Sequence, residues 1–165
     1  MMRVIISAVS VLSLAMFAIG CADQRNGVDR ATLPREVSDA LDRAAQIYVQ
    51  PLSGARWAKV HVLKGTDHPL YQLQGTNDRG NKIEIEVTSA GRVVEVEEHG
   101  ISLGEVPAAV LDALRVKMPQ FNPTLVEAVY QNQQNQPLVF GFEGRDAAGN
   151  EIEIYVTADG KAVLN

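Results

Sequence analysis

The sequence predicts an α+β protein of two tandem repeats, each a helix packed on a three- or four-stranded antiparallel β-meander. Two observations predict this fold class. Blocks of sequence recur in the same order along the chain, and in each copy a helix-like spacing of apolar residues precedes strict apolar–polar alternation. The first repeat is predicted over residues 32–100 and the second over residues 101–165.

The duplication rests on two aligned segments. Residues 80–94 align without gaps on residues 149–163, where nine of the fifteen pairs are identical at an offset of 69. Upstream, residues 34–41 match residues 107–114 at an offset of 73. The alignment leaves open whether the two units share one continuous sheet or pack as separate sheets.

A helix is expected to open each repeat. Apolar side chains recur at helical spacing, behind a proline placed where the first turn tolerates a missing N–H group. These apolar residues are Val37, Leu41, Ala44 and Tyr48 in the first repeat, and Val110, Ala113 and Leu114 in the second.

Alternation with a period of two follows each helix. Within residues 83–88, isoleucine and valine point to one face of the predicted sheet and glutamate and threonine to the other; residues 152–157 repeat this pattern. Residues 89–91 and 158–160 are predicted hairpin turns in which glycine supplies a positive φ. We therefore expect one face of the sheet to be covered and the other to be wet or docked on a partner.

Composition excludes several classes of protein. Hydrophobic residues make up 46% of the 165 residues and charged residues 21%, as in a globular protein. The 15 basic against 20 acidic residues give a net charge of −5, which argues against a nucleic-acid partner. The single cysteine excludes an intramolecular disulfide and any multi-cysteine metal site.

The N-terminal residues are typical of an export signal. Residues 1–20 carry one basic residue, Arg3, before an apolar run. Residues 18–21 resemble a lipobox, a resemblance that implies acylation of Cys21, and residues 21–31 then form the lipidated N-terminus and a polar tether. With Ala22 after the cysteine, the lipoprotein sorting pattern implies a lipid-anchored protein at the periplasmic face of the outer membrane. An ordinary signal peptide and an uncleaved anchor helix are the alternatives.

The paired blocks resemble the PepSY-like family, in the branch grouped with β-lactamase inhibitor protein. The resemblance lies in residues 80–96 and 149–164, each behind a helix that a proline precedes. It implies a bacterial envelope module without a catalytic residue, and some members of the family inhibit peptidases or β-lactamases through a sheet face. It does not transfer a set of inhibitory residues to this chain.

The residues themselves predict no catalytic site, no metal site and no cofactor, so we expect a protein that is not an enzyme. The serines after the signal lie in no nucleophile motif. His61, His68 and His99 lack the spacing of a helical zinc site. His61 and the pair Asp67–His68 could meet in space, but exposed strand and loop histidines are the simpler interpretation.

Acidic side chains mark a candidate binding face. Glu84 and Glu86 on one strand and Glu95 and Glu97 on its hairpin partner are expected to share the outer sheet face, with nothing apolar nearby in sequence to raise a carboxyl pKa. Like charges opposed across strands are mildly destabilising, which favours a cationic partner or a metal ion. A solvated face that keeps the protein soluble is the alternative.

Two aromatic residues complete the candidate partner-binding set. Trp57 is expected either to face outward as an interface anchor or to begin its strand by packing under the helix. Tyr155 is the outward aromatic of the second repeat, in the place of Glu86.

The sequence thus predicts an exported, non-enzymatic lipoprotein that binds an envelope protein or peptide through its sheet face. A more specific hypothesis is that it inhibits an envelope hydrolase. Two rival hypotheses remain: a cation-binding or sensing module that uses the acidic face, and a passive structural protein of the envelope.

Overall fold

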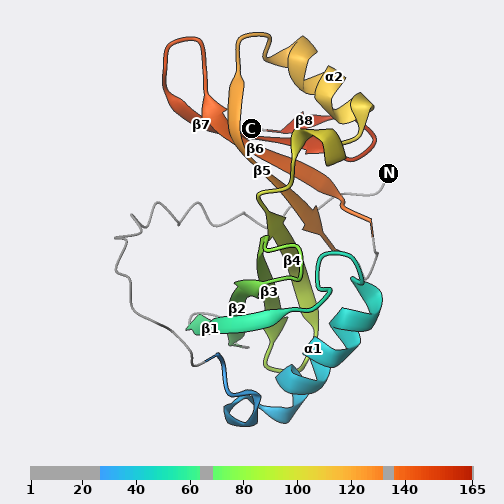
Figure 1. Ribbon diagram of the computed structural model, residues 1–165, viewed down its shortest axis with the longest axis vertical. Coiled ribbons are helices and arrows are strands. Elements are labelled where there is room, and N and C mark those ends of the chain that lie inside the picture. The colour runs from blue at the N-terminus through green and yellow to red at the C-terminus, as the bar shows by residue number, and fades with distance from the viewer. Residues whose placement is uncertain (1–26, 64–68, 132–135, 165) are drawn as a thin grey trace.

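In the part of the chain that the structure describes, eight antiparallel strands form one continuous sheet, and two α-helices lie against one of its faces (Figure 1). The computed structural model describes residues 27–63, 69–131 and 136–164. The helices are α1 (Arg35–Ile47) and α2 (Ala108–Lys117), with short 3-10 helices η1 (Arg30–Thr32) and η2 (Leu103–Glu105) ahead of them. The α+β class predicted from the sequence is confirmed.

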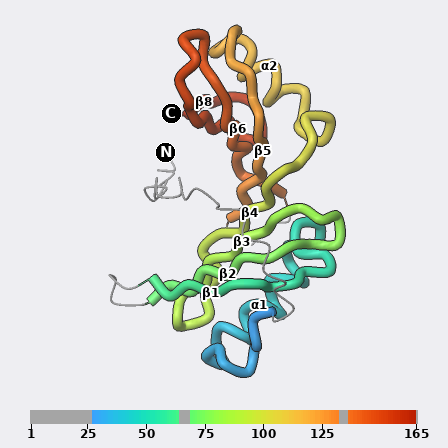
Figure 2. Tube along the Cα trace, turned by 60° about the vertical axis from the view of Figure 1, so that its left-hand side comes forward, coloured from blue at the N-terminus to red at the C-terminus, as the bar shows by residue number. Residues whose placement is uncertain are grey.

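The strands follow one another across the sheet in chain order, so every strand pairs with its neighbours in sequence (Figure 2). They are β1 (Arg56–Leu63), β2 (Leu70–Thr76), β3 (Lys82–Thr88), β4 (Val93–His99), β5 (Asn122–Tyr130), β6 (Val139–Arg145), β7 (Glu151–Thr157) and β8 (Val163–Leu164). In chain order α1 precedes β1–β4, and α2 precedes β5–β8.

The sheet is continuous because β4 pairs with β5. Four residue pairs join them, from Val96 opposite Tyr130 to His99 opposite Glu127. This pairing answers the question that the sequence left open. It also places side chains of β4 and β5 next to one another on both faces of the sheet.

The apolar face of α1 is the one that the periodicity predicts. Val37, Leu41, Ala44 and Tyr48 are all at least 96% buried. They pack against the sheet face formed by the isoleucines and valines of β3, and burying a side chain of this size contributes about 1.5–3 kcal/mol. Helix α2 is anchored in the same way by Val110 and Leu114.

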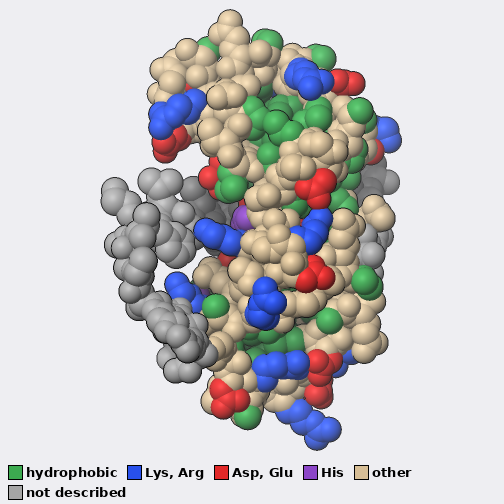
Figure 3. Space-filling model, in the orientation of Figure 1, with side chains coloured by type: hydrophobic (Ala, Val, Ile, Leu, Met, Phe, Trp, Pro, Cys, Tyr) green, Lys and Arg blue, Asp and Glu red, His purple; other side chains and the backbone are tan. Residues whose placement is uncertain are grey.

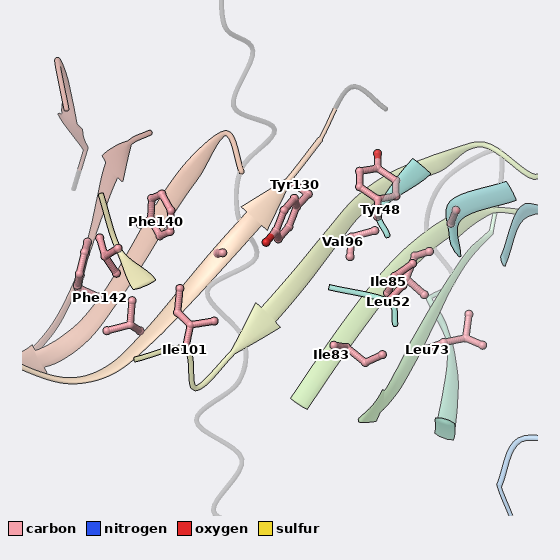
Figure 4. Close-up of a cluster of buried hydrophobic side chains, with 14 of the residues drawn as sticks. Tyr48, Leu52, Leu73, Ile83, Ile85, Val96, Ile101, Tyr130, Phe140 and Phe142 are labelled. Carbon is pink, nitrogen blue, oxygen red and sulfur yellow. The ribbon is translucent and has the colours of Figure 1, made fainter. Parts of the chain in front are cut away.

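One core runs beneath both helices (Figure 4). The ring of Tyr48 meets the ring of Tyr130 edge-on, with centroids 6.3 Å apart and planes at 79°. Tyr48 follows α1 and Tyr130 ends β5, so this contact bridges the part of the core beneath α1 and the part built on β5–β7.

Two glycines let neighbouring strands approach closely at β-bulges. Gly75 of β2 lies opposite Trp57, where β1 is bulged, and a Cβ on Gly75 would lie 2.2 Å from the backbone oxygen of Arg56. Gly144 of β6 has the same relation to the bulge in β5, with a Cβ 2.2 Å from the backbone oxygen of Asn122. Both positions therefore exclude any side chain.

Among the described residues, no helix has the length and apolar character needed to span a membrane.

Candidate functional site

The sheet face opposite the helices, called here the open face, carries a band of polar side chains from β2 to β7. Strand alternation places them there because their neighbours in sequence occupy the core face. The band includes Gln72, Gln74, Glu84, Glu86, Glu95, Glu97, His99, Glu127, Glu143, Glu153 and Tyr155. Seven of these eleven residues are glutamates. The register also places Lys82 opposite His99 and Lys59 of β1 opposite Gln74, so the open face is acidic with its charge partly offset by two lysines.

The four glutamates singled out from the sequence lie together on this face. In the register of β3 and β4, Glu84 is opposite Glu97 and Glu86 is opposite Glu95. Glutamine side chains relieve part of the repulsion: Gln74 donates to Glu84 at 2.9 Å, and Gln72 donates to the same carboxylate.

The expectation that nothing would raise these carboxyl pKa values was wrong. Burial, together with the charges of Glu95 and Glu84, raises the pKa of Glu86. Burial and the charges of Glu127 and Glu95 outweigh the opposing effect of His99 and raise the pKa of Glu97 to about 7. Sequence gave no sign of this burial, because it comes from side chains on neighbouring strands.

His99 lies at the centre of the open face, between two carboxylates. Its Nδ1 is 2.9 Å from Glu127 Oε2 and its Nε2 is 3.3 Å from Glu97 Oε2. Burial lowers the pKa of His99, but the hydrogen bonds to Glu127 and Glu97 and their charges more than offset this and raise it to about 10. The imidazole is therefore held in its charged form at neutral pH.

Glu127 is buried although it lies on the open face. Only 6% of its side chain is exposed, because it lies over Gly141, where a Cβ would come within 2.6 Å of its Oε1. Tyr155 flanks the same glycine and donates its hydroxyl proton to Glu153 at 2.7 Å. Burial and the charge of Glu127 raise the pKa of Tyr155, so its hydroxyl stays protonated and acts as a donor.

We predict that the free energy of unfolding, measured without metal ions in solution, falls as pH rises from about 5 to about 10. His99 has a native pKa of about 10 against an ordinary 6.5, so its stabilising effect is complete below pH 6.5 and is lost as pH approaches 10. Glu97 acts in the same direction: its pKa is raised from 4.5 to about 7, so above pH 4.5 ionisation favours the unfolded chain.

Urea unfolding at a series of pH values, with a chelator present, measures this effect. The variant His99→Gln should show a shallower fall between pH 6.5 and 10 than the wild type. A wild type that is more stable at pH 9 than at pH 6 would contradict the prediction.

Trp57 does not lie on the open face. It packs against the core, opposite Gly75, because the bulge between Trp57 and Lys59 shifts the alternation of β1 by one residue. The interpretation of Trp57 as an outward anchor on the sheet was therefore wrong, and its packing alternative holds. His61 is exposed on β1.

Four other predictions concern residues that lie wholly or mostly outside the described part of the chain. The export signal of residues 1–20 and the lipidation site Cys21 lie there, as does most of the tether. The pair Asp67–His68 also lies there, so its proposed meeting with His61 stays a prediction.

A buried polar network lies on the opposite, helix-covered side of β4. Glu98 is fully buried, and its Oε1 accepts hydrogen bonds from Asn77 at 2.6 Å, from Asn81 at 2.9 Å and from Arg79. Arg79 also binds Glu105 of η2 at 2.7 Å. This network joins the β2–β3 turn to the segment ahead of α2 and is structural.

Two hollows lie beside α2, one along Ala109 to Val116 and the other past the end of the helix at Met118. Figure 3 shows hydrophobic side chains gathered in the upper half of the molecule. One is lined by Ala109, Ala113, Val116 and Val163 with isolated charged residues between them. Neither groups titratable side chains as the open face does. The open face is therefore the candidate site.

Sequence reasoning missed His99, Glu127, Glu143 and Glu153 as members of one site. His99 carried a signal, since it shares the alternation of Glu95 and Glu97 on β4. The three glutamates of the β5–β7 strands carried none, because only the pairing of β4 with β5 brings them to His99.

Three solved structures resemble the chain in fold. A protein of Bacteroides eggerthii assigned to the periplasm aligns with a TM-score of 0.57 and 20% identity, over 81% of this chain and 86% of its own. A DUF2874 family protein of Bacteroides uniformis aligns with a TM-score of 0.57 and 17% identity, over 80% and 86%. A BLIP-like protein of Bacteroides fragilis aligns with a TM-score of 0.53 and 16% identity, over 77% and 82%. The chain has a BLIP-like fold.

The BLIP-like fold confirms, for the architecture alone, the resemblance to the β-lactamase-inhibitor group found in the sequence. No protein-family model and no curated protein matches the chain. Kinship with the PepSY-like family, the tandem repeat and lipidation stay predictions. In this BLIP-like fold the acidic band lies on the sheet face opposite the helices.

Proposed function

We propose that this protein is a non-enzymatic binding protein of the bacterial cell envelope, whose open face docks on a positively charged surface of a partner protein or peptide. One observation carries the proposal: Glu84, Glu86, Glu95 and Glu97 form two directly opposed glutamate pairs on a sheet face that neither α1 nor α2, the two α-helices of the described residues, covers. A face of this charge is complementary to a cationic surface of a partner.

The electrostatics of the face support docking. Opposed like charges destabilise a strand pair by roughly tenths of a kcal/mol each, and a lysine or arginine from a partner would remove that cost. Burial and the charges of Glu95 and Glu84 raise the pKa of Glu86, so a negative charge on this side chain is disfavoured in the unbound protein. Complementary charge of this kind speeds association and selects the partner.

An envelope location is supported by two lines of evidence. The N-terminal segment is typical of an export signal that ends at a lipidated cysteine, Cys21. The similar protein of Bacteroides eggerthii is assigned to the periplasm. We propose that residues 32–100 and 101–165 are tandem repeats that a lipid anchor holds at the outer membrane, by way of the tether of residues 21–31.

Inhibition of an envelope hydrolase is the sharper form of the proposal. The BLIP-like fold supports it, since some members of the group that the sequence resembles inhibit enzymes through a sheet face. The absence of nucleophile motifs from the sequence favours a binding role over catalysis.

Capture of partners from the envelope fraction of the native organism tests the proposal. The purified protein is immobilised beside a variant carrying Glu84→Lys and Glu86→Lys, and a matched control carries Glu36→Lys and Asp39→Lys on the exposed side of α1. Both variants change the net charge by the same amount. Only the open-face variant should lose the partner, by about tenfold or more, because a like-charge contact costs several kcal/mol.

The captured partner should also dissociate as salt is raised, since screening weakens contacts between exposed charges. Equal recovery by wild type and both variants would overturn docking on the open face and favour a passive envelope protein. Loss of the partner from both variants would show an effect of net charge alone and would equally overturn it.

A further inference from the structure

A metal-ligating set of side chains lies on the open face around His99. It combines an imidazole with carboxylates from three other strands, and so differs from a purely acidic patch. One ligand atom from each of Glu97, His99 and Glu127 lies within 4.8 Å of the others, and the same holds for Glu127, Glu143 and Glu153. The two groups share the buried residue Glu127.

We propose that His99 and Glu127 bind one divalent transition-metal ion, with Glu97 as the residue that orients the imidazole; the exposed side chains of Glu143 and Glu153, which gather around Glu127 and not around His99, would turn toward the ion to complete the site. The proposal is independent of docking by a partner. An imidazole nitrogen among carboxylate oxygens suits zinc and its first-row neighbours, whereas calcium and magnesium prefer oxygen ligands alone.

The distance between His99 and Glu127 is close to that of two ligands of one ion. His99 Nδ1 and Glu127 Oε2 are 2.9 Å apart. Two ligands held at about 2.0–2.2 Å from a tetrahedral zinc ion lie roughly 3.3–3.6 Å from each other, so these two atoms would move apart by about half an ångström to share the ion. The ion would therefore take the place of the proton that now lies between these two atoms.

The other nitrogen of His99 is already oriented as metal-binding histidines require. Its Nε2 faces Glu97 Oε2 at 3.3 Å. Histidines that bind metals through one nitrogen nearly always donate the other N–H to a carboxylate, backbone oxygen or water, which fixes the tautomer and the ring plane. Glu97 supplies that acceptor here.

The set is particular to this part of the sheet and does not follow from the internal repeat. At the offset of 69, Gly141 corresponds to Gln72 and Tyr155 to Glu86. Gly141 is essential to the arrangement, because a Cβ there would lie 2.6 Å from Glu127 Oε1 and 2.7 Å from Glu127 Cγ. The chain thus departs from its own repeat where the buried carboxylate needs room.

Calorimetric titration with Zn²⁺ tests the proposal on purified, chelator-stripped protein at pH 7. The wild type should bind one ion per chain and release protons, because the imidazole must lose its proton to bind the metal. The variants His99→Gln and Glu127→Gln should each lose about tenfold or more in affinity, and Glu97→Gln about tenfold. His61→Gln, a histidine on exposed β1, is the matched control and should bind like the wild type.

A further variant distinguishes loss of the metal site from loss of the folded structure. Glu143 and Glu153 are exposed, so the double variant Glu143→Gln/Glu153→Gln should fold normally. Its affinity for Zn²⁺ should nevertheless be lower than that of the wild type by about tenfold or more. Full affinity in this variant, or in His99→Gln, would overturn the proposal. So would the absence of Zn²⁺ binding by the wild type, or equally strong binding of Ca²⁺ that His99→Gln leaves unchanged.

Partner capture repeated with a chelator and with Zn²⁺ separates this site from the docking function. Zinc binding that depends on His99 supports the metal site whether or not a partner is captured. Partner capture that persists with chelator, from a protein that binds no Zn²⁺, supports docking and overturns the metal site.

Discussion

Replacing Asn77 with aspartate is expected to lower the free energy of unfolding by about 3–5 kcal/mol, the usual cost of leaving a buried charge uncompensated. Asn77 is fully buried, and its Nδ2 donates to Glu98 Oε1 at 2.6 Å and to the Pro51 backbone oxygen at 3.2 Å. Aspartate would remove both donated hydrogen bonds and set a second carboxylate against Glu98. Urea unfolding at pH 7 measures the loss.

The corresponding turn between β6 and β7 provides the matched control. Asp146 stands at the offset of 69 from Asn77, and its Oδ1 accepts from the backbone N–H groups of Ala148 and Asn150, both at 2.9 Å. Asn77 Oδ1 accepts from its own turn in the same way. Because Asp146 is only partly buried and has no counterpart of Glu98 beside it, Asp146→Asn should change stability much less. Equal effects of the two substitutions would contradict the role assigned to Asn77.

Substituting alanine for Gly75 or Gly144 is expected to destabilise the protein by about 3 kcal/mol in each case, near the upper end for overpacking, because backbone must move. The added Cβ would lie 2.2 Å from the backbone oxygen of Arg56 or Asn122 and 2.9 Å from the carbonyl carbon. Backbone on a paired strand cannot swing aside as a long side chain does.

Chemical denaturation of both variants measures the effect, and Gly104→Ala is the control. Gly104 lies in η2, where a Cβ would meet only Ser102 Oγ, at 3.8 Å. Its replacement should therefore be close to neutral. Unfolding midpoints for Gly75→Ala and Gly144→Ala equal to that of the wild type would show that the two bulges yield easily.

Local patterns in the sequence predict much of the fold. The helix over Val37 to Tyr48 and the alternation of Ile83, Ile85 and Val87 follow from spacing alone, and all five of these residues are at least 99% buried. Alternation alone could not decide between the outward and the packed position of Trp57, because a bulge changes the alternation of a strand without a marker in the strand itself. The joining of the two parts of the sheet could not be predicted either, since periodicity carries no information on which strands pair.

The candidate site was predictable only in part. Alternation places Glu84, Glu86, Glu95 and Glu97 on one face, which the register of β3 and β4 bears out. The burial of Glu127 could not be predicted from the sequence, because it depends on two neighbouring strands. His99 contacts it from one strand, and the absence of a side chain at Gly141 leaves room for it on the other. Such a site is a property of cross-strand register and cannot be deduced from the sequence of any one strand.

The order of the strands in the sheet has a consequence for how the chain folds. Every described strand from β1 to β8 pairs only with the strands next to it in sequence, so the loops closed during folding are short, apart from the β4–β5 connection, which contains η2 and α2. Proteins rich in such local contacts fold faster than those built on distant pairings, because less chain entropy is lost before each contact forms. Within β1–β4 and within β5–β8, each hairpin can therefore serve as the template for the next strand, and the two parts can form separately before β4 pairs with β5.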